Sequence, residues 1–175
     1  MKLKKITEGI PGYIFYSVLG IVMAFLINQT LGFALSTDLP VVAVVTSSME
    51  HDATTEIAHY QWLNDNLGYS RSYIDSWPIP TGFLIGDMPI VEGAKQYNVG
   101  DVVVYTVSGQ NVPIIHRIIK INSDGTYMIK GDHNSGLLPF ENSIEKSQIH
   151  GRVIFIIPKL GYFKVLVSKI TGGLV

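Results

Sequence analysis

The sequence predicts a mainly β domain that follows a single N-terminal transmembrane helix and carries one short helical insertion. Three observations support this fold class. Residues 11–35 contain no charged side chain, and most of the recognisable segments beyond them are short β-branched runs bounded by turn residues. Residues 54–68 differ, because their apolar side chains recur at helical spacing. A hydrophobic fraction of 47% with only 15% charged residues also favours a membrane-attached chain.

Length, charge and cysteine content exclude several classes of protein. The 175 residues suit one membrane segment and one domain that buries its own core. The net charge is −1, from 13 basic and 14 acidic residues, so nucleic acid is not an expected partner. The chain has no cysteine, which excludes disulfides, thiolate chemistry and cysteine metal sites.

The uncharged segment 11–35 is predicted to be a retained membrane anchor. At ~1.5 Å per residue it can cross a hydrocarbon core of ~30 Å, and it is too long for a cleavable signal peptide with an apolar region of ~7–15 residues. Its charged neighbours are Lys2, Lys4, Lys5 and Glu8 before it and Asp38 after it. The positive-inside tendency therefore predicts a cytoplasmic N-terminus, residues 1–10, and an extracytoplasmic β domain, residues 36–161.

Most of the elements predicted after the anchor are β-strands. They are short and β-branched, and Gly, Pro, Asn or Asp bounds each of them. The predicted strands are Val41–Val45, Phe83–Ile85, Asp101–Val107, Ile114–Ile121, Tyr127–Lys130 and Val153–Ile157. Residues 122–125, Asn-Ser-Asp-Gly, predict a turn that joins two of these strands as a hairpin.

An insertion at residues 51–80 interrupts the series of strands. A short helix is predicted over residues 54–68, where the apolar residues at helical spacing are Ile57, Tyr60, Leu63 and Leu67. Thr54 or Thr55 can cap its start, and Gly68 can close its end.

Two further segments have no regular strand pattern. Residues 69–80 are predicted to form a loop in which Tyr73 and Trp77 either contact lipid or, as the pattern favours, pack on the strands. The tail, residues 162–175, is too short and too charged for a second membrane crossing. An interfacial amphipathic helix and a simple capping element both remain open for it.

A serine is the best candidate nucleophile. Residues 46–49, Thr-Ser-Ser-Met, directly follow the predicted strand Val41–Val45 and lie just beyond the anchor. This placement suggests a hydroxyl held at a strand end on the membrane surface, although a solvated turn is the common alternative. A serine hydroxyl becomes nucleophilic only when a neighbouring base accepts its proton.

The candidate bases are the histidines His51, His59, His116, His133 and His150. His59 belongs to the predicted helix and His150 to a polar loop, so we expect both at the surface, whereas His51 is close enough in sequence to touch the serine site. His116 lies in the middle of the most regular predicted strand, on the face where an apolar residue is expected. Strand position alone favours a satisfied, half-buried histidine there. No metal-ligand spacing is visible, so no metal site is expected.

Five short motifs follow the anchor in a fixed order: 46–49 Thr-Ser-Ser-Met, 100–103 Gly-Asp-Val-Val, 114–119 Ile-Ile-His-Arg-Ile-Ile, 131–134 Gly-Asp-His-Asn and 153–161 Val-Ile-Phe-Ile-Ile-Pro-Lys-Leu-Gly. Through these motifs the chain resembles type I signal peptidases. The His-Arg pair at 116–117 is similar to the archaeal and endoplasmic-reticulum members, whereas bacterial members carry Lys-Arg. The resemblance covers nearly the whole chain except the insertion, and it implies a signal-peptidase-like β domain.

The resemblance implies a set of catalytic roles. Ser48 stands in the position of the nucleophile and His116 in that of the general base. Asp132 would orient His116, and the Ser48 backbone N–H with the Thr46 hydroxyl would hold the oxyanion. The family often has a second acidic residue at a place where this chain has a leucine, so Glu141, three positions further on, is the alternative acidic partner.

The same resemblance implies the function. We expect a membrane-bound serine endopeptidase that removes signal peptides with small residues at positions −3 and −1 from secreted preproteins. The implied location is the cell membrane, with one crossing and an extracytoplasmic catalytic domain. The expected partners are preprotein signal peptides, membrane lipid and the secretion machinery. No cofactor and no metal are expected.

Two alternatives compete with this interpretation. A self-cleaving repressor-type peptidase of the same β fold would pair serine with a lysine such as Lys120 or Lys130, but the chain has no DNA-binding region. A non-catalytic, membrane-anchored β module that binds a partner on the outer face is the alternative from another functional class.

Overall fold

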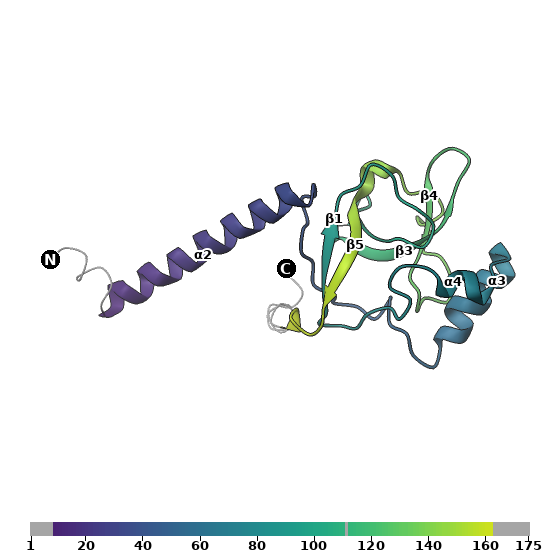
Figure 1. Cartoon of the computed structure of the whole chain (residues 1–175), viewed down its shortest axis with the longest axis horizontal. Coiled ribbons are helices and arrows are strands. Elements are labelled where there is room, and N and C mark those ends of the chain that lie inside the picture. Colours follow the sequence, from purple (N-terminus) through teal and green to yellow (C-terminus); the bar gives the residue numbers. More distant parts are fainter. Residues whose placement is uncertain (1–8, 111, 163–175) are drawn as a thin grey trace.

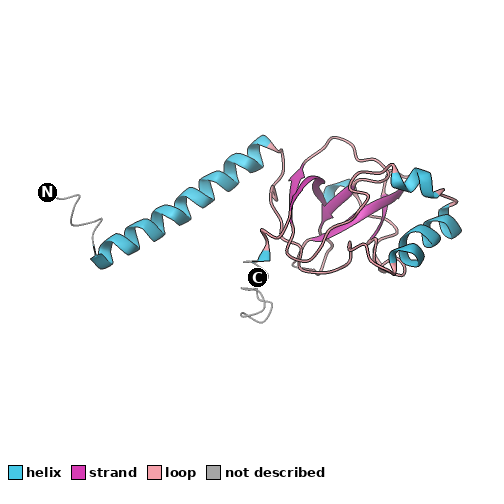
Figure 2. Ribbon diagram, turned by 60° about the horizontal axis from the view of Figure 1, so that its bottom comes forward, coloured by secondary structure: helices cyan, strands magenta, loops and turns pink. Residues whose placement is uncertain are grey.

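The structure, a computed structural model, describes residues 9–110 and 112–162 (Figure 1). It begins with helix α2, Gly9–Ala34, whose length and composition make it a candidate membrane span. The helix projects away from the β domain in Figures 1 and 2. Residues 1–8 of the predicted cytoplasmic segment and residues 163–175 of the predicted tail lie outside the described residues.

A five-stranded antiparallel sheet forms the centre of the domain, in agreement with the predicted mainly β fold class. Its strands are β1 Met88–Glu92, β2 Val102–Tyr105, β3 Ile114–Ile121, β4 Tyr127–Lys130 and β5 Ile149–Ile157, and their order across the sheet is β1-β5-β2-β3-β4. The predicted turn after β3 is confirmed: Gly125 N donates to Asn122 O at 3.0 Å. Gly125 has a φ of 85°, in the region that favours glycine.

Two predicted strands, Val41–Val45 and Phe83–Ile85, are wrong as regular strands. Residues 41–45 run extended beside β1, but the structure assigns them only one bridge, between Val41 and Ile90. Val44 N donates to Asp87 O at 3.0 Å, so the first part of this segment pairs with β1 and its last part pairs with the turn that precedes β1. That turn, Leu84–Asp87, ends the second predicted strand, because Asp87 N bonds back to Leu84 O.

Strand β1 was missed because it contains Pro89, which cannot donate to a strand ladder. β1 lies at the edge of the sheet, the place where proline is tolerated. On the side of β1 that faces away from β5, the Pro89 carbonyl accepts a hydrogen bond from Val42 N at 3.2 Å, and no N–H of Pro89 is required there. The segment that leads to Ser48 is therefore held against the edge strand.

The insertion is helical but more irregular than predicted. A π-helix, η1 Glu56–Gln61, leads into α3 Trp62–Leu67, which ends at Gly68 in the left-handed conformation, as expected. Thr55 occupies the cap position of η1 without a capping hydrogen bond from its side chain. The predicted loop after Gly68 contains a further short helix, α4 Arg71–Asp75, whose start is capped by the Ser70 side chain.

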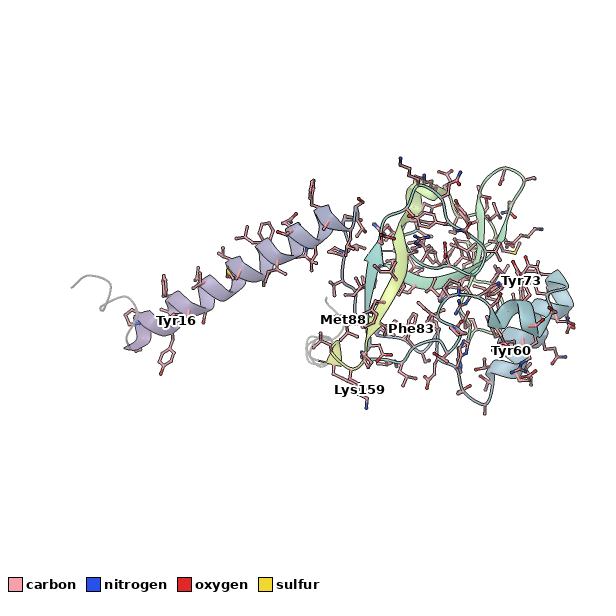
Figure 3. The ribbon with its side chains drawn as sticks, in the orientation of Figure 1. Tyr16, Tyr60, Tyr73, Phe83, Met88 and Lys159 are labelled. Atoms are coloured by element: carbon pink, nitrogen blue, oxygen red, sulfur yellow. The ribbon has the colours of Figure 1, made fainter. Side chains whose placement is uncertain are left out.

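The helices of the insertion pack on the sheet at the end of the domain away from α2 (Figure 2). Trp77 is buried in a cluster with Leu63, Ile74 and Ile119, so the favoured packing role is confirmed for this residue. Tyr73 keeps an exposed face; it is labelled with Tyr60 on the insertion in Figure 3, far from Tyr16 on α2.

Strand β3 separates two cores by alternation of its side chains. Ile118 joins the core that also holds Val103, Tyr105 and Ile129, whereas Ile119 joins the cluster under the insertion. His116 shares the parity of Ile118. Arg117 points to the same face of β3 as Ile119, so His116 lies on the side of the central core and Arg117 on the side of the insertion.

The end of α2 is attached to the sheet by direct bonds. Leu35 O accepts a hydrogen bond from Gly93 N at 2.8 Å, just after β1. A side chain at Gly93 would collide with the carbonyl of Ser36. Thr37 Oγ1 donates to His150 O of β5 at 2.8 Å. The helix therefore continues into a fixed connection and not into a free linker.

Candidate active site

Ser48 and His116 line one cleft of about 420 Å³. Its walls are mostly apolar and come from the extended segment before Ser48, the start of β3 and the loop after β4. The apolar lining residues are Ala43, Val44, Val45, Phe83, Val112, Pro113, Ile114, Ile115, Leu138 and Phe140. Thr46 and Asn134 add polar groups beside Ser48.

Ser48 is held in a tight turn at the end of the extended segment. Glu50 N donates to Ser47 O at 2.9 Å, and the Ser48 carbonyl accepts from His133 N at 2.9 Å. Met49 is buried and packs with Val44, Phe83 and their neighbours. The buried methionine fixes the turn from below, which leaves the half-buried Ser48 facing the cleft. Its Oγ lies 3.3 Å from the hydroxyl of Thr46.

His116 is buried in β3, with only 3% of its surface exposed. Its Nδ1 is hydrogen-bonded to Glu141 Oε1. We assign the hydrogen of this bond to Nδ1, because a carboxylate oxygen accepts, and this assignment leaves the lone pair on Nε2. A Cβ built on Gly131 would lie 2.8 Å from both His116 Nε2 and the Ser48 carbonyl oxygen. His116 Nε2 and the Ser48 carbonyl therefore border the same small space next to Gly131.

Glu141 is completely buried, and hydrogen bonds to both oxygens fix its carboxylate. Oε1 accepts from Tyr105 OH at 2.8 Å as well as from His116, while Oε2 accepts from Leu138 N at 2.6 Å. Its backbone carbonyl accepts from Ile129 N in β4 at 2.9 Å. The loop is attached to β4 at the glutamate and again at Ile144, which exchanges two backbone hydrogen bonds with Tyr127.

The sequence did not identify Tyr105 as a site residue. The pairing of β2 with β3 places it near His116. Val103 of β2 pairs with His116 of β3, so Tyr105, two residues along β2, lies on the same face and one step away. Burial is the main cause that raises the pKa of the Tyr105 phenol, and the neighbouring Glu141 adds to the effect. The phenol is therefore neutral and acts as a hydrogen-bond donor.

The expected contact between Asp132 and His116 is not found. Asp132 accepts from Arg117, with Nε 3.0 Å from Oδ1 and Nη2 2.7 Å from Oδ2, and from His51 Nε2 at 2.9 Å. Alternation along the strands is the physical reason: Arg117 pairs with Lys130, and Asp132 lies two residues beyond Lys130. The carboxylate therefore belongs to the arginine face, opposite His116.

Electrostatics agree with this placement of Asp132. Burial alone would raise the pKa of its carboxyl, but the charge of Arg117 and the hydrogen bond from His51 outweigh burial and hold that pKa below its usual range. Arg117 also donates to the carbonyls of Pro78, Ile79 and Gly100. The pair thus ties the insertion to the sheet next to the cleft.

His59 was expected at the surface, and this prediction is wrong. It is 2% exposed, and its Nδ1 lies 3.4 Å from Asp132 Oδ1. Burial lowers its pKa to about 4, so His59 is neutral. His150, the other histidine expected at the surface, lies in β5 and is partly exposed between Thr106 and Asp38.

His51, His59 and Asp132 together offer three metal-ligating atoms within 4.8 Å of one another. The sequence gave no such signal, because the three residues lie in separate segments. Arg117 argues against a cation at this place: its guanidinium already occupies both oxygens of Asp132. A divalent ion would therefore bring further positive charge beside a buried cation.

Neither lysine of the Ser-Lys alternative lines the cleft with Ser48. Lys130 is buried, and burial lowers its pKa to about 8. Its amino group donates to the carbonyls of Ala58 at 2.6 Å and Gly131 at 2.9 Å, so it connects the insertion to the turn after β4. Lys120 is exposed near the end of β3. The geometry therefore favours histidine as the base.

Comparison with known proteins gives one consistent relationship, although no family model matches the chain. The signal peptidase complex catalytic subunit SEC11 of Scheffersomyces stipitis is 28% identical over 155 residues, which cover 83% of this chain and 76% of the relative. The subunit of the same name from Pyricularia oryzae is 25% identical over 154 residues, or 83% and 74% of the two chains.

A third relative, the subunit of that name from Colletotrichum graminicola, is 32% identical over a shorter stretch of 83 residues, 43% of this chain and 48% of the relative. The relationship agrees with the ordered motifs, the antiparallel β domain and the N-terminal apolar helix described above. The chain is therefore a relative of the endoplasmic-reticulum type of signal peptidase.

Proposed function

We propose that this protein is a membrane-anchored serine endopeptidase that removes N-terminal signal peptides from preproteins. The observation that carries the proposal is the cleft shared by Ser48 and His116, in which a buried carboxylate, Glu141, fixes the histidine from behind. The relatives support it, because they are named as catalytic subunits of signal peptidase complexes.

The proposed chemistry is acyl transfer. His116 Nε2 accepts the proton of Ser48 Oγ as that oxygen attacks the scissile carbonyl, and His116 then gives the proton to the leaving amine. Water attacks the acyl-enzyme with the same base assistance and releases Ser48. Glu141 keeps Nδ1 protonated and stabilises the imidazolium that forms in each transition state. Catalytic hydrogen bonds often tighten only when substrate binds.

The proposed oxyanion site consists of the Ser48 backbone N–H and the Thr46 hydroxyl. The two hydroxyl oxygens are 3.3 Å apart, so an oxygen of the tetrahedral intermediate formed on Ser48 would develop next to Thr46. A single donor aimed at such an oxygen typically lowers the barrier by about 3 kcal/mol. Removal of the Thr46 hydroxyl therefore tests whether this residue belongs to the oxyanion site.

The cleft fits an extended, apolar substrate segment. Val44 uses its backbone N–H and C=O on the side of β1, with Asp87 and Gly86. By alternation, Ala43 and Val45 present their backbone groups on the opposite side, toward the cleft that both residues line. A peptide added as a strand here would place alternate side chains in the apolar wall, consistent with small residues at positions −3 and −1.

The proposed topology follows from α2 and the flanking charges. Residues 11–35 form the single crossing of the cell membrane, residues 1–10 are cytoplasmic, and residues 36–161 form the extracytoplasmic catalytic domain. The expected partners are preprotein signal peptides, lipid and the secretion machinery. The relatives, as named subunits of a complex, support an association with further proteins.

The decisive experiment compares Ser48→Ala with its neighbour Ser47→Ala in full-length, detergent-solubilised protein. Each variant is incubated with a preprotein, and the new N-terminus is sequenced. We expect Ser48→Ala to abolish cleavage, and Ser47→Ala to retain most of it because Ser47 does not line the cleft. Cleavage that survives in Ser48→Ala would refute the peptidase and favour a non-catalytic β module.

A further inference from the structure

We propose that Tyr105 is a positioning residue for the base, and that its phenol sets the protonation behaviour of the His116–Glu141 pair. Neither the motifs nor the relatives assign a role to this side chain. The inference rests on the proposed peptidase function, and it concerns how the general base of that site is held in its working form.

The contacts of Tyr105 are specific. Its side chain is completely buried, and its hydroxyl lies 2.8 Å from Glu141 Oε1 and 3.3 Å from His116 Nδ1. The ring centroids of Tyr105 and His116 are 6.2 Å apart. The phenol oxygen therefore lies where the imidazole meets the carboxylate, deep behind the cleft and away from the substrate.

The hydrogen atoms in this triangle have one consistent arrangement. Nδ1 of His116 donates to Glu141 Oε1, so it cannot also accept from the phenol. The Tyr105 hydroxyl must then donate to Oε1 as well. One carboxylate oxygen thus receives two donors, while Leu138 N serves the other oxygen at 2.6 Å.

Two donors on one oxygen have a chemical consequence for the base. A hydrogen bond to the charged form of a carboxylate stabilises that form and lowers its proton affinity. The Glu141 carboxylate, shared between two donors, therefore attracts the imidazolium form of His116 less strongly than an unshared carboxylate would. Tyr105 keeps His116 neutral, and so active as a base, down to a lower pH.

The other charged groups around the pair are engaged elsewhere. Arg117 faces the opposite side of β3 and is bound by Asp132. Lys130 of β4 bonds to the carbonyls of Ala58 and Gly131. From β2 and the loop after β4, the titratable groups that face His116 are Tyr105 and Glu141. Removal of the phenol oxygen should therefore act on this pair alone.

The test measures kcat and KM against pH for preprotein cleavage by full-length Tyr105→Phe. We expect kcat to fall about 10-fold with KM within about twofold, because Glu141 and the imidazole lose a contact that holds their orientation while the contacts to substrate are unchanged. The acid limb of kcat/KM should move to higher pH by about 0.5 to 1 unit. A side chain that only fills the core would lower stability and leave this limb in place.

Tyr97→Phe is the matched control. Tyr97 belongs to the same buried core, but its hydroxyl accepts a weak hydrogen bond from Ala94 N at 3.4 Å and does not face the catalytic pair. We expect an unchanged pH profile for this variant. An equal shift in Tyr97→Phe and Tyr105→Phe would overturn the inference, since the effect would then be general loosening of the core.

A second substitution predicts the opposite sign and does not depend on the folding of Tyr105→Phe. Incorporation of 3-fluorotyrosine at position 105 makes the phenol a stronger donor, so the acid limb should move to lower pH. An unmoved limb in the fluorotyrosine protein, or in a folded Tyr105→Phe, refutes the role of Tyr105. Such a result leaves the proposed function intact as long as Ser48→Ala remains inactive, which keeps the two failures distinguishable.

Discussion

The two buried carboxylates, Glu141 and Asp132, allow a matched pair of isosteric substitutions. Glu141→Gln and Asp132→Asn each replace one carboxylate oxygen by an amide nitrogen. The geometry predicts different consequences, because Glu141 contacts His116, the proposed base, whereas Asp132 neutralises the buried Arg117. We expect the first substitution to act mainly on turnover and the second mainly on stability.

The expected loss in Glu141→Gln follows from the charge that develops on His116. The imidazolium formed in the transition state lies about 4 Å from the centre of the carboxylate, and at an effective dielectric constant of ~20 their attraction is about 4 kcal/mol. Since ~1.4 kcal/mol corresponds to a factor of ten, kcat should fall by ~10²–10³-fold. The amide can also donate to Nδ1 and so favour the wrong tautomer.

The expected loss in Asp132→Asn is one of folding free energy. Removal of one partner from a buried ion pair typically destabilises a protein by about 3–5 kcal/mol, which corresponds to a fall of roughly 10 °C or more in the thermal midpoint. The folded fraction should keep its kcat within about 10-fold, because Asp132 does not touch His116.

Both quantities are measured on both variants, with turnover taken well below either thermal midpoint. The assay is preprotein cleavage by full-length protein, and unfolding is followed by circular dichroism. An inactive Asp132→Asn with an unchanged midpoint, beside an active Glu141→Gln, would show that Asp132 serves the base and would refute the reasoning from the contacts.

The other predictions concern the serine side of the site and the acid stability of the fold. His116→Ala should be about as inactive as Ser48→Ala, and the double variant little worse, because members of one catalytic unit are not additive; additive losses in single-turnover assays would contradict this. Gly131→Ala should lower kcat at least ~10²-fold, since a Cβ would lie 2.8 Å from His116 Nε2 and from the Ser48 carbonyl; near-normal turnover would show that this turn can yield. Thr46→Val should lower kcat by ~10²-fold while Thr46→Ser keeps most of it, and equal activities would remove Thr46 from the oxyanion site. Burial lowers the pKa of His59 from 6.5 to about 4, so the unfolded chain binds a proton in that interval and the folded chain does not; stability should therefore fall by about 3 kcal/mol as the pH drops from 6.5 to 4. Denaturant titrations should show a flatter pH dependence in His59→Gln, and an unchanged slope would assign the acid sensitivity to other groups.

Strong local patterns explain which strands were predicted well. The ends of β3 and β4 coincide with the prediction, because a regular β-branched run and the turn at residues 122–125 determine both. Strand β1 was missed because Pro89 conceals an edge strand, and Phe83–Ile85 was predicted in its place because the turn at Leu84–Asp87 depends on a hydrogen bond from Leu84 N to the Asp87 side chain. Such a bond is not visible in hydrophobic periodicity.

In the insertion, the burial predicted from α-helical periodicity was wrong because the first part of the helix is a π-helix. Ordinary helical spacing placed Ile57 inside and His59 outside, whereas the structure has Ile57 68% exposed and His59 2% exposed. The segment Glu56–Gln61 is a π-helix, and its wider turn moves each side chain to a different face. Periodicity beyond this point, at Leu63, agrees with the prediction again.

The candidate site was predictable up to the point where strand register was needed. Ser48 and His116 come from motifs, and the structure places both at one cleft. The choice between Asp132 and Glu141 depends on which strand face each residue shares, and so on the pairing of Arg117 with Lys130. The sequence supplied both acidic candidates, but without register it could not rank them by geometry, nor could it find Tyr105.

The bonded junction between α2 and the sheet has a consequence for the choice of cleavage site. Leu35 O is held by Gly93, and Thr37 by the carbonyl of His150 in β5, so the sheet cannot swing freely on its anchor. With α2 in the bilayer, as proposed, Ser48 then works at one height above the lipid. We therefore expect the length of the polar stretch between the hydrophobic part of a signal peptide and its scissile bond to determine whether that bond reaches Ser48.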